Sequence, residues 1–106
     1  MQNVETSVKV VRPAGALTSA TAAAFKEEML TALTSAHASE VAIDMAAVDS
    51  VDNHGLVALL AGCDRAKQLR KRVSLCDVAP AVRIVFELAQ LDRAVLMVDS
   101  QELLAA

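Results

Sequence analysis

The sequence predicts a single α/β domain built around a mixed, largely parallel β-sheet. A short, nearly all-apolar run at residues 41–45 is typical of a strand covered on both faces, as in parallel sheets. Apolar residues recur at helical spacing over 56–69, and a similar pattern over 18–37 precedes the apolar run. Strands that alternate with helices in this way form parallel sheets with right-handed crossovers.

The first elements are a strand, a hairpin and a helix. Residues 7–11 are rich in valine and predict a strand. Pro13 and Gly15 then interrupt it, and a short return strand at 16–17 is expected to complete a hairpin. Thr18, Ser19 and Thr21 are competent N-caps for the first helix.

The second half of the chain repeats the strand and helix pattern. A strand is expected at 73–76, and Pro80 marks the start of a third helix that residues 91–93 close. A last strand at 94–98 and a terminal helix at 100–104 complete about 4–5 strands and about 4 helices. We expect one domain over 1–106, with residues 1–3 disordered.

Composition and charge exclude several classes of function. No apolar run approaches the ~20 residues that span a bilayer, so no direct membrane insertion is expected. No signal-peptide pattern opens the chain, which favours the cytoplasm. A net charge of -3 and 2% aromatic residues argue against nucleic-acid binding. These observations favour a protein partner and no cofactor, and the sequence leaves the oligomeric state open.

The polar residues gather where the apolar strand 41–45 gives way to the second helix. Since binding sites form at the carboxyl ends of parallel strands, this turn is the expected partner surface. Its candidate residues are Asp49, Ser50, Asp52, Asn53, His54, Gly55 and Leu56.

Simple structural roles compete with recognition at this turn. Asp52 and Asn53 could cap the helix, contact a partner, or do both. Gly55 permits a tight strand-to-helix turn or a close approach of a partner. Neither the acidic residues nor the two cysteines, Cys63 and Cys76, show the converging pattern of a metal site, so we expect no metal.

The run Asp52-Asn53-His54-Gly55-Leu56 resembles the Asp-Ser-Ser-Gly-Leu signature of STAS domains. This family includes bacterial anti-sigma-factor antagonists and the cytoplasmic tails of sulphate transporters. The segments at 73–76, 79–83, 86–88 and 91–93 are similar to segments at the same places in that family. The resemblance covers nearly the whole chain.

The resemblance implies a protein-interaction module for signal transduction and transcription regulation in bacteria, not an enzyme. In antagonists of this type, an anti-sigma factor that is a serine kinase phosphorylates the serine before the glycine, and the phosphate switches off their complex. Here His54 occupies that position, so we expect no phosphorylation there. Ser50 is the less favoured alternative acceptor.

The first interpretation is therefore an antagonist that binds an anti-sigma factor through residues 49–56 and is not switched at position 54. The second is a cytoplasmic accessory subunit of a membrane lipid transporter. A third, from a different class, is a sensor that holds a phosphate or nucleotide at the start of the second helix.

Overall fold

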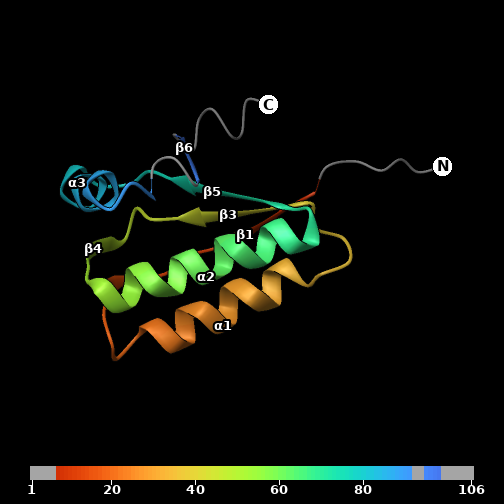
Figure 1. Ribbon diagram of the computed structural model, residues 1–106, viewed down its shortest axis with the longest axis horizontal. Helices are drawn as coiled ribbons and strands as arrows, with labels where there is room; N and C mark the ends of the chain where they lie inside the picture. Colours follow the sequence, from red (N-terminus) through yellow and green to blue (C-terminus); the bar gives the residue numbers. More distant parts are fainter. Residues whose placement is uncertain (1–6, 92–94, 99–106) are drawn as a thin grey trace.

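The computed structural model describes residues 7–91 and 95–98, and its elements alternate between strands and helices (Figure 1). In chain order they are β1 (Val8–Val11), β2 (Gly15–Leu17), α1 (Ala22–Leu33), β3 (Glu40–Asp44), β4 (Val48–Val51), α2 (Asn53–Leu69), β5 (Arg72–Cys76), α3 (Pro80–Leu88) and β6 (Leu96–Val98). The α/β class is confirmed. The expectations for residues 1–3 and for a helix at 100–104 lie outside the described residues.

A four-stranded sheet forms the centre of the domain, in the order β1-β3-β5-β6, and each neighbouring pair is parallel. The second strand in this order, β3, is fully covered, with Val41 and Ile43 at 0% exposure and Ala42 at 1%. This burial on both faces explains why its sequence shows no polar alternation.

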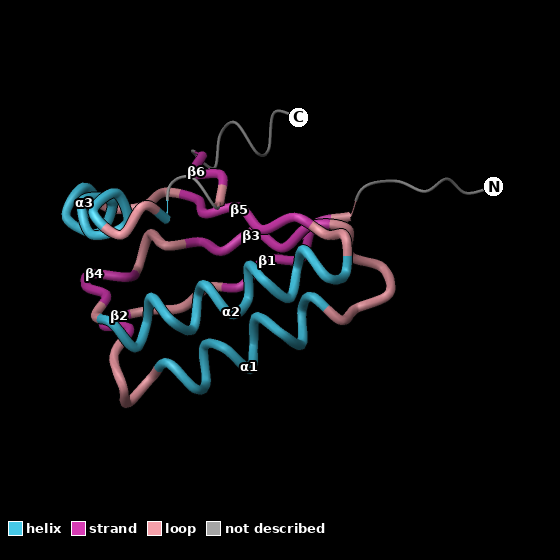
Figure 2. Tube along the Cα trace, in the orientation of Figure 1, coloured by secondary structure: helices cyan, strands magenta, loops and turns pink. Residues whose placement is uncertain are grey.

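The expected N-terminal hairpin is wrong, because β2 does not pair with β1. Instead β2 pairs with β4 in a separate, parallel, two-stranded sheet (Figure 2). Gly15, at φ 75°, redirects the chain after Pro13 without reversing it, and its amide donates to Ala47 at 2.8 Å. Strand β1 pairs in parallel with β3, and β2 pairs in parallel with β4. The chain therefore runs in the same direction through β1 and β2, whereas a hairpin would reverse it.

Helices α1 and α2 lie side by side on one face of the main sheet, with their N-termini at the same end (Figure 1). Phe25, Met29 and Leu33 of α1 are buried, as the spacing predicts. This helix ends at Leu33, four residues before the expected end at position 37. The ammonium group of Lys71 donates to the carbonyls of Leu33 and Ser35 at 2.6 and 2.7 Å, and this cation stabilises the end of the helix.

The third helix, α3, packs beside β4, beyond the end of the main sheet (Figure 1). Pro80 occupies its first turn and buried Phe86 faces the core, as predicted. Its outer face leaves Ile84 and Leu88 at 56% and 81% exposure. None of the described helices has the length and hydropathy needed to cross a membrane.

Candidate functional site

The predicted partner surface spans a strand and a helix start. Residues Asp49 and Ser50 lie within β4, where both are exposed, although the sequence indicated a loop there. The helix α2 then begins at Asn53, three residues before the position that apolar spacing predicts. This difference arises because Asn53 and His54 form an exposed polar first turn, which carries no hydrophobic signal.

Asp52 is the N-cap of α2 and fixes the geometry of the signature. Its backbone is extended, with φ -105° and ψ -171°. Its Oδ1 atom accepts hydrogen bonds from the amides of His54 at 2.8 Å and Gly55 at 3.2 Å. These bonds satisfy two of the amides that a helix start leaves without partners. The predicted capping role is therefore confirmed for Asp52.

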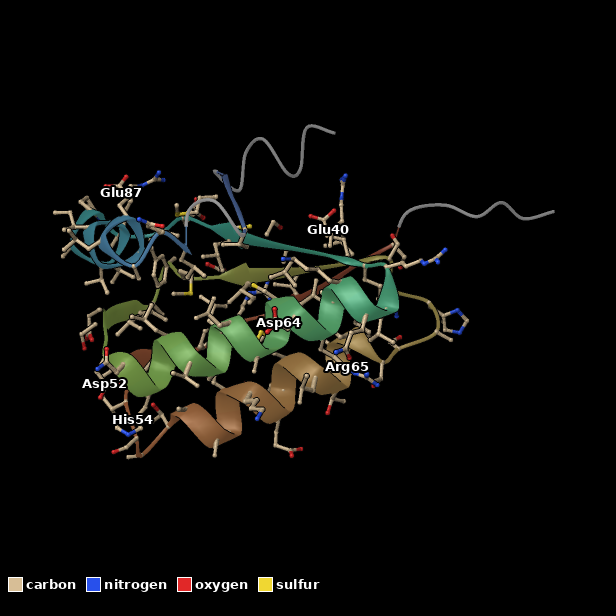
Figure 3. All side chains as sticks on the ribbon, in the orientation of Figure 1. Glu40, Asp52, His54, Asp64, Arg65 and Glu87 are labelled. Atoms are coloured by element: carbon tan, nitrogen blue, oxygen red, sulfur yellow. The ribbon has the colours of Figure 1, made fainter. Side chains whose placement is uncertain are left out.

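The imidazole of His54 lies above this cap. Its Nδ1 atom is 3.7 Å from Oδ2 of Asp52, and the two side chains are 65% and 47% exposed. Figure 3 shows both at the end of α2 that lies nearest β4. Because both remain exposed, the pair contributes little to stability and leaves the imidazole accessible to a partner.

Gly55 is buried against β2. A Cβ at this position would lie 2.7 Å from the carbonyl oxygen of Leu17 and 2.9 Å from the Leu17 Cβ. The close approach at this glycine is therefore made by β2 of the same chain, in the place where the sequence allowed a partner. With Leu56 half-buried, the exposed part of the signature is Asp52, Asn53 and His54.

An open groove of about 440 Å³ adjoins His54 and runs between α1 and α2. We call it the α1–α2 groove. Its lining residues are Ser19, Ala22, Ala23, Lys26, Asn53, His54, Val57 and Ala58. The walls are mostly apolar, with polar groups at the end where both helices begin. Val57 projects from α2 with 65% of its surface exposed.

The sequence does not predict the half of this groove that comes from α1 and the loop before it. Two of the predicted residues, Asn53 and His54, line it, whereas Asp49 and Ser50 do not. From the sequence, the residues of α1 and of the loop before it are expected only to cap the helix or to belong to a helical face. No local pattern identifies them, since they reach the site only through the packing of α1 against α2.

Neither cysteine lines the α1–α2 groove. Both cysteines are buried, and burial, helped by the Asp64 carboxylate, raises the pKa of Cys63 to about 11. Burial likewise raises the pKa of Cys76. Within residues 7–91 and 95–98, no group of three His, Cys, Asp or Glu residues is placed to hold a metal ion.

The fold and the capped helix start together define a small α/β module whose signature forms the first turn of α2, with Asp52, Asn53 and His54 exposed. The family model for the MlaB-type STAS domain matches residues 2–99, and the chain belongs to this STAS domain family. No curated protein matches the chain in sequence.

Several solved structures share this fold. A Thermotoga maritima protein proposed to be an anti-sigma factor antagonist is similar with a TM-score of 0.78 and 22% identity, covering 87% of this chain and 79% of that one. The unphosphorylated anti-sigma factor antagonist SpoIIAA, known from Bacillus, gives a TM-score of 0.70 at 18% identity, covering 98% and 92% of the two chains. A sulfate transporter family protein from Wolinella succinogenes gives 0.74 at 14% identity, covering 87% and 76%.

Proposed function

We propose that this domain is a non-catalytic interaction module that binds a regulatory protein through the start of α2 and the adjoining α1–α2 groove. The observation that carries the proposal is the position of His54. The Asp52 cap holds the first turn of α2 in place, so that Asn53 and His54 stay exposed beside an apolar groove. An exposed apolar wall with polar groups at one end is typical of a surface that buries a partner side chain.

The favoured partner is an anti-sigma factor of the serine kinase type. The similarity in fold to SpoIIAA and the signature at residues 52–56 both support this assignment. Since His54 replaces the acceptor serine, the complex is not switched off by phosphorylation at that position.

A second candidate is an accessory subunit of a membrane transporter, acting in the cytoplasm. It is supported by the similarity in fold to a sulfate transporter family protein. In this case the same surface would dock on a cytoplasmic part of the transporter.

The test begins with affinity capture from an extract of the source cells, followed by mass spectrometry of the captured proteins. A kinase-type anti-sigma factor supports the first candidate, and a transporter ATPase supports the second. Capture of neither class would contradict both assignments. The captured partner is then produced by itself, and its Kd for the domain is measured by calorimetry.

Two exposed apolar residues give a matched pair of variants for that measurement. Val57→Ser removes an apolar side chain from the groove, and we expect it to raise Kd by about tenfold or more, as is common for a buried anchor. Leu88→Ser makes the same type of change at an even more exposed position on α3, outside the groove. A loss of affinity in Leu88→Ser with none in Val57→Ser would place the interface on α3 and overturn the proposed surface.

A further inference from the structure

The loop before α1 and the start of α2 follow the carboxyl ends of β2 and β4, which lie at the same end of the two-stranded sheet. Leu17 of β2 is paired with Val51 of β4, and the amide of Asp52 donates to the carbonyl of Leu17 at 3.0 Å. Ser19 lies two residues beyond Leu17, and Asn53 lies two residues beyond Val51. Both line the α1–α2 groove together with His54. Ser19 therefore places a hydroxyl in a groove where the signature supplies Asn53 and His54 and no serine.

The neighbouring threonines are engaged in holding the loop. The hydroxyl of Thr21 donates to the carbonyl of Ala16 at 2.7 Å and accepts from the amide of Thr18 at 2.9 Å. The Thr18 hydroxyl accepts from the amide of Ala20 at 3.2 Å. Phosphorylation of Thr21 would remove the hydroxyl hydrogen that it donates to Ala16. The Thr18 side chain is half-buried and already holds the turn to Ala20, so both threonines are less favourable acceptors than an exposed hydroxyl without a partner.

Ser19 has no such role. Its side chain is exposed, and its hydroxyl makes no hydrogen bond with any residue in the described part of the chain. Ser50, by contrast, donates to Oδ1 of Asp49 at 3.4 Å. A phosphate on Ser50 would therefore lie beside a carboxylate and be repelled by it.

The charges around Ser19 favour a phosphate more than those around Ser50. Lys26 lines the same groove and supplies a cation within it. Ser19 also precedes the Thr21 N-cap of α1, so a phosphate there would lie near the positive end of a helix dipole. Asp52, next in sequence to the groove-lining Asn53, carries a negative charge that the two amide hydrogen bonds to its Oδ1 partly offset.

We propose that Ser19 is the phosphorylation site of this domain, in place of the missing acceptor at position 54. A serine kinase transfers the γ-phosphoryl group of ATP to the Ser19 Oγ atom. A bond forms between Oγ and the γ-phosphorus, the bond to the β-phosphate oxygen breaks, ADP leaves, and the hydroxyl proton passes to the base of the kinase. The phosphate then occupies the polar end of the groove and prevents docking. This inference rests on the proposed function for the identity of the kinase.

Labelling of the full chain tests the site. The protein is incubated with radiolabelled ATP, phosphatase inhibitors and an extract of the source cells, and labelled peptides are mapped by mass spectrometry. Wild type and Ser50→Ala are expected to carry the label on Ser19 to equal extents. Ser19→Ala should lose it and Ser19→Thr should regain it, with circular dichroism showing that each variant is folded. Absence of label from wild type, or label that persists in Ser19→Ala, would overturn the proposal.

The blocking effect is measured with phosphoserine installed at position 19 during synthesis. We expect its Kd for the captured partner to rise by about tenfold or more over the unmodified chain. An unchanged Kd would overturn the blocking role. If a partner is captured and Val57→Ser weakens its binding, but no label is found on the domain, only the modification site is overturned. If Ser19 is labelled but no partner of either class is captured, only the proposed function is overturned.

Discussion

The carbonyl oxygen of Leu17 lies where a side chain on Gly55 would have to be placed. A Cβ built on Gly55 would be 2.7 Å from that oxygen and 3.0 Å from Cγ1 of Val51. The first turn of α2 thus packs directly on the backbone of β2, which fixes the helix start relative to the loop that carries Ser19.

Gly55→Ala is expected to destabilise the domain for this reason. Overpacking costs about 1–3 kcal/mol, and the higher helix propensity of alanine returns about 1 kcal/mol. Because the Cβ would meet backbone at 2.7 Å, the upper part of this cost applies, and we expect the free energy of unfolding, measured with urea, to fall by about 1–2 kcal/mol. Gly62→Ala is the control. Its new Cβ would meet the flexible end of the Met29 side chain, whereas a Cβ at position 55 would meet the backbone of Leu17. An unchanged or higher stability of Gly55→Ala would show that the helix start can move.

The Asp52 cap gives a second stability prediction. Asp52→Ala removes the acceptor of two amide hydrogen bonds and should lower the free energy of unfolding by about 1 kcal/mol. Asp52→Asn keeps a capping oxygen and should lose only a few tenths of that amount. Urea denaturation of both variants separates capping from charge. Equal losses in the two variants would mean that the carboxylate charge, and not the cap, provides the stabilisation.

The buried thiol of Cys63 predicts a loss of stability in alkali. Its pKa is raised from 9.0 to about 11, so the folded protein keeps this proton over a range in which the unfolded chain releases it. The stabilisation is fully present below about pH 9 and is lost as pH rises to about 11, with a total on the order of 2–3 kcal/mol. Comparing the pH dependence of unfolding in wild type and Cys63→Ala isolates this contribution. If the two curves are parallel over this range, the thiol does not titrate as described.

Restoring a serine to the signature tests whether the surface still presents an acceptor. In a Ser19→Ala background, His54→Ser should become phosphorylated at position 54 in the labelling experiment. The reason is that the new hydroxyl would lie on the exposed first turn of α2, held by the Asp52 cap. Asn53→Ser in the same background is the control, because the signature places the acceptor next to the glycine. Label on the Asn53→Ser variant alone would show that the kinase reads the loop in a different register.

Most of the fold could be predicted because its signals are local. The buried strand β3, the N-cap at Asp52 and the proline at the start of α3 each follow from a few neighbouring residues. Four residues, Val48 to Val51, form the strand that was missed. Asp49 and Ser50 are adjacent and both exposed, so the segment has no alternation of apolar and polar residues. Its identity as a strand depends on pairing with β2, far away in the sequence.

The site was only half predictable for the same reason. The signature at 52–56 is contiguous and can be read directly from the sequence. Lys26 and Ser19 join it because Leu17 pairs with Val51 and α1 packs against α2. The sequence does not specify that register, and the expected hairpin would have placed β2 on a different partner.

The separate pairing of β2 with β4 also bears on how the domain opens. The amides of β3 lie in a strand flanked on both sides by β1 and β5, whereas β2 and β4 have only each other among the described strands. We therefore expect hydrogen exchange to be slowest in β3 and faster in the two-stranded sheet, where each strand has one neighbour. Because both helix starts are attached to that small sheet, the groove would lose its shape at a lower free energy than the core. Recognition would then be sensitive to mild destabilisation that leaves the rest of the molecule folded.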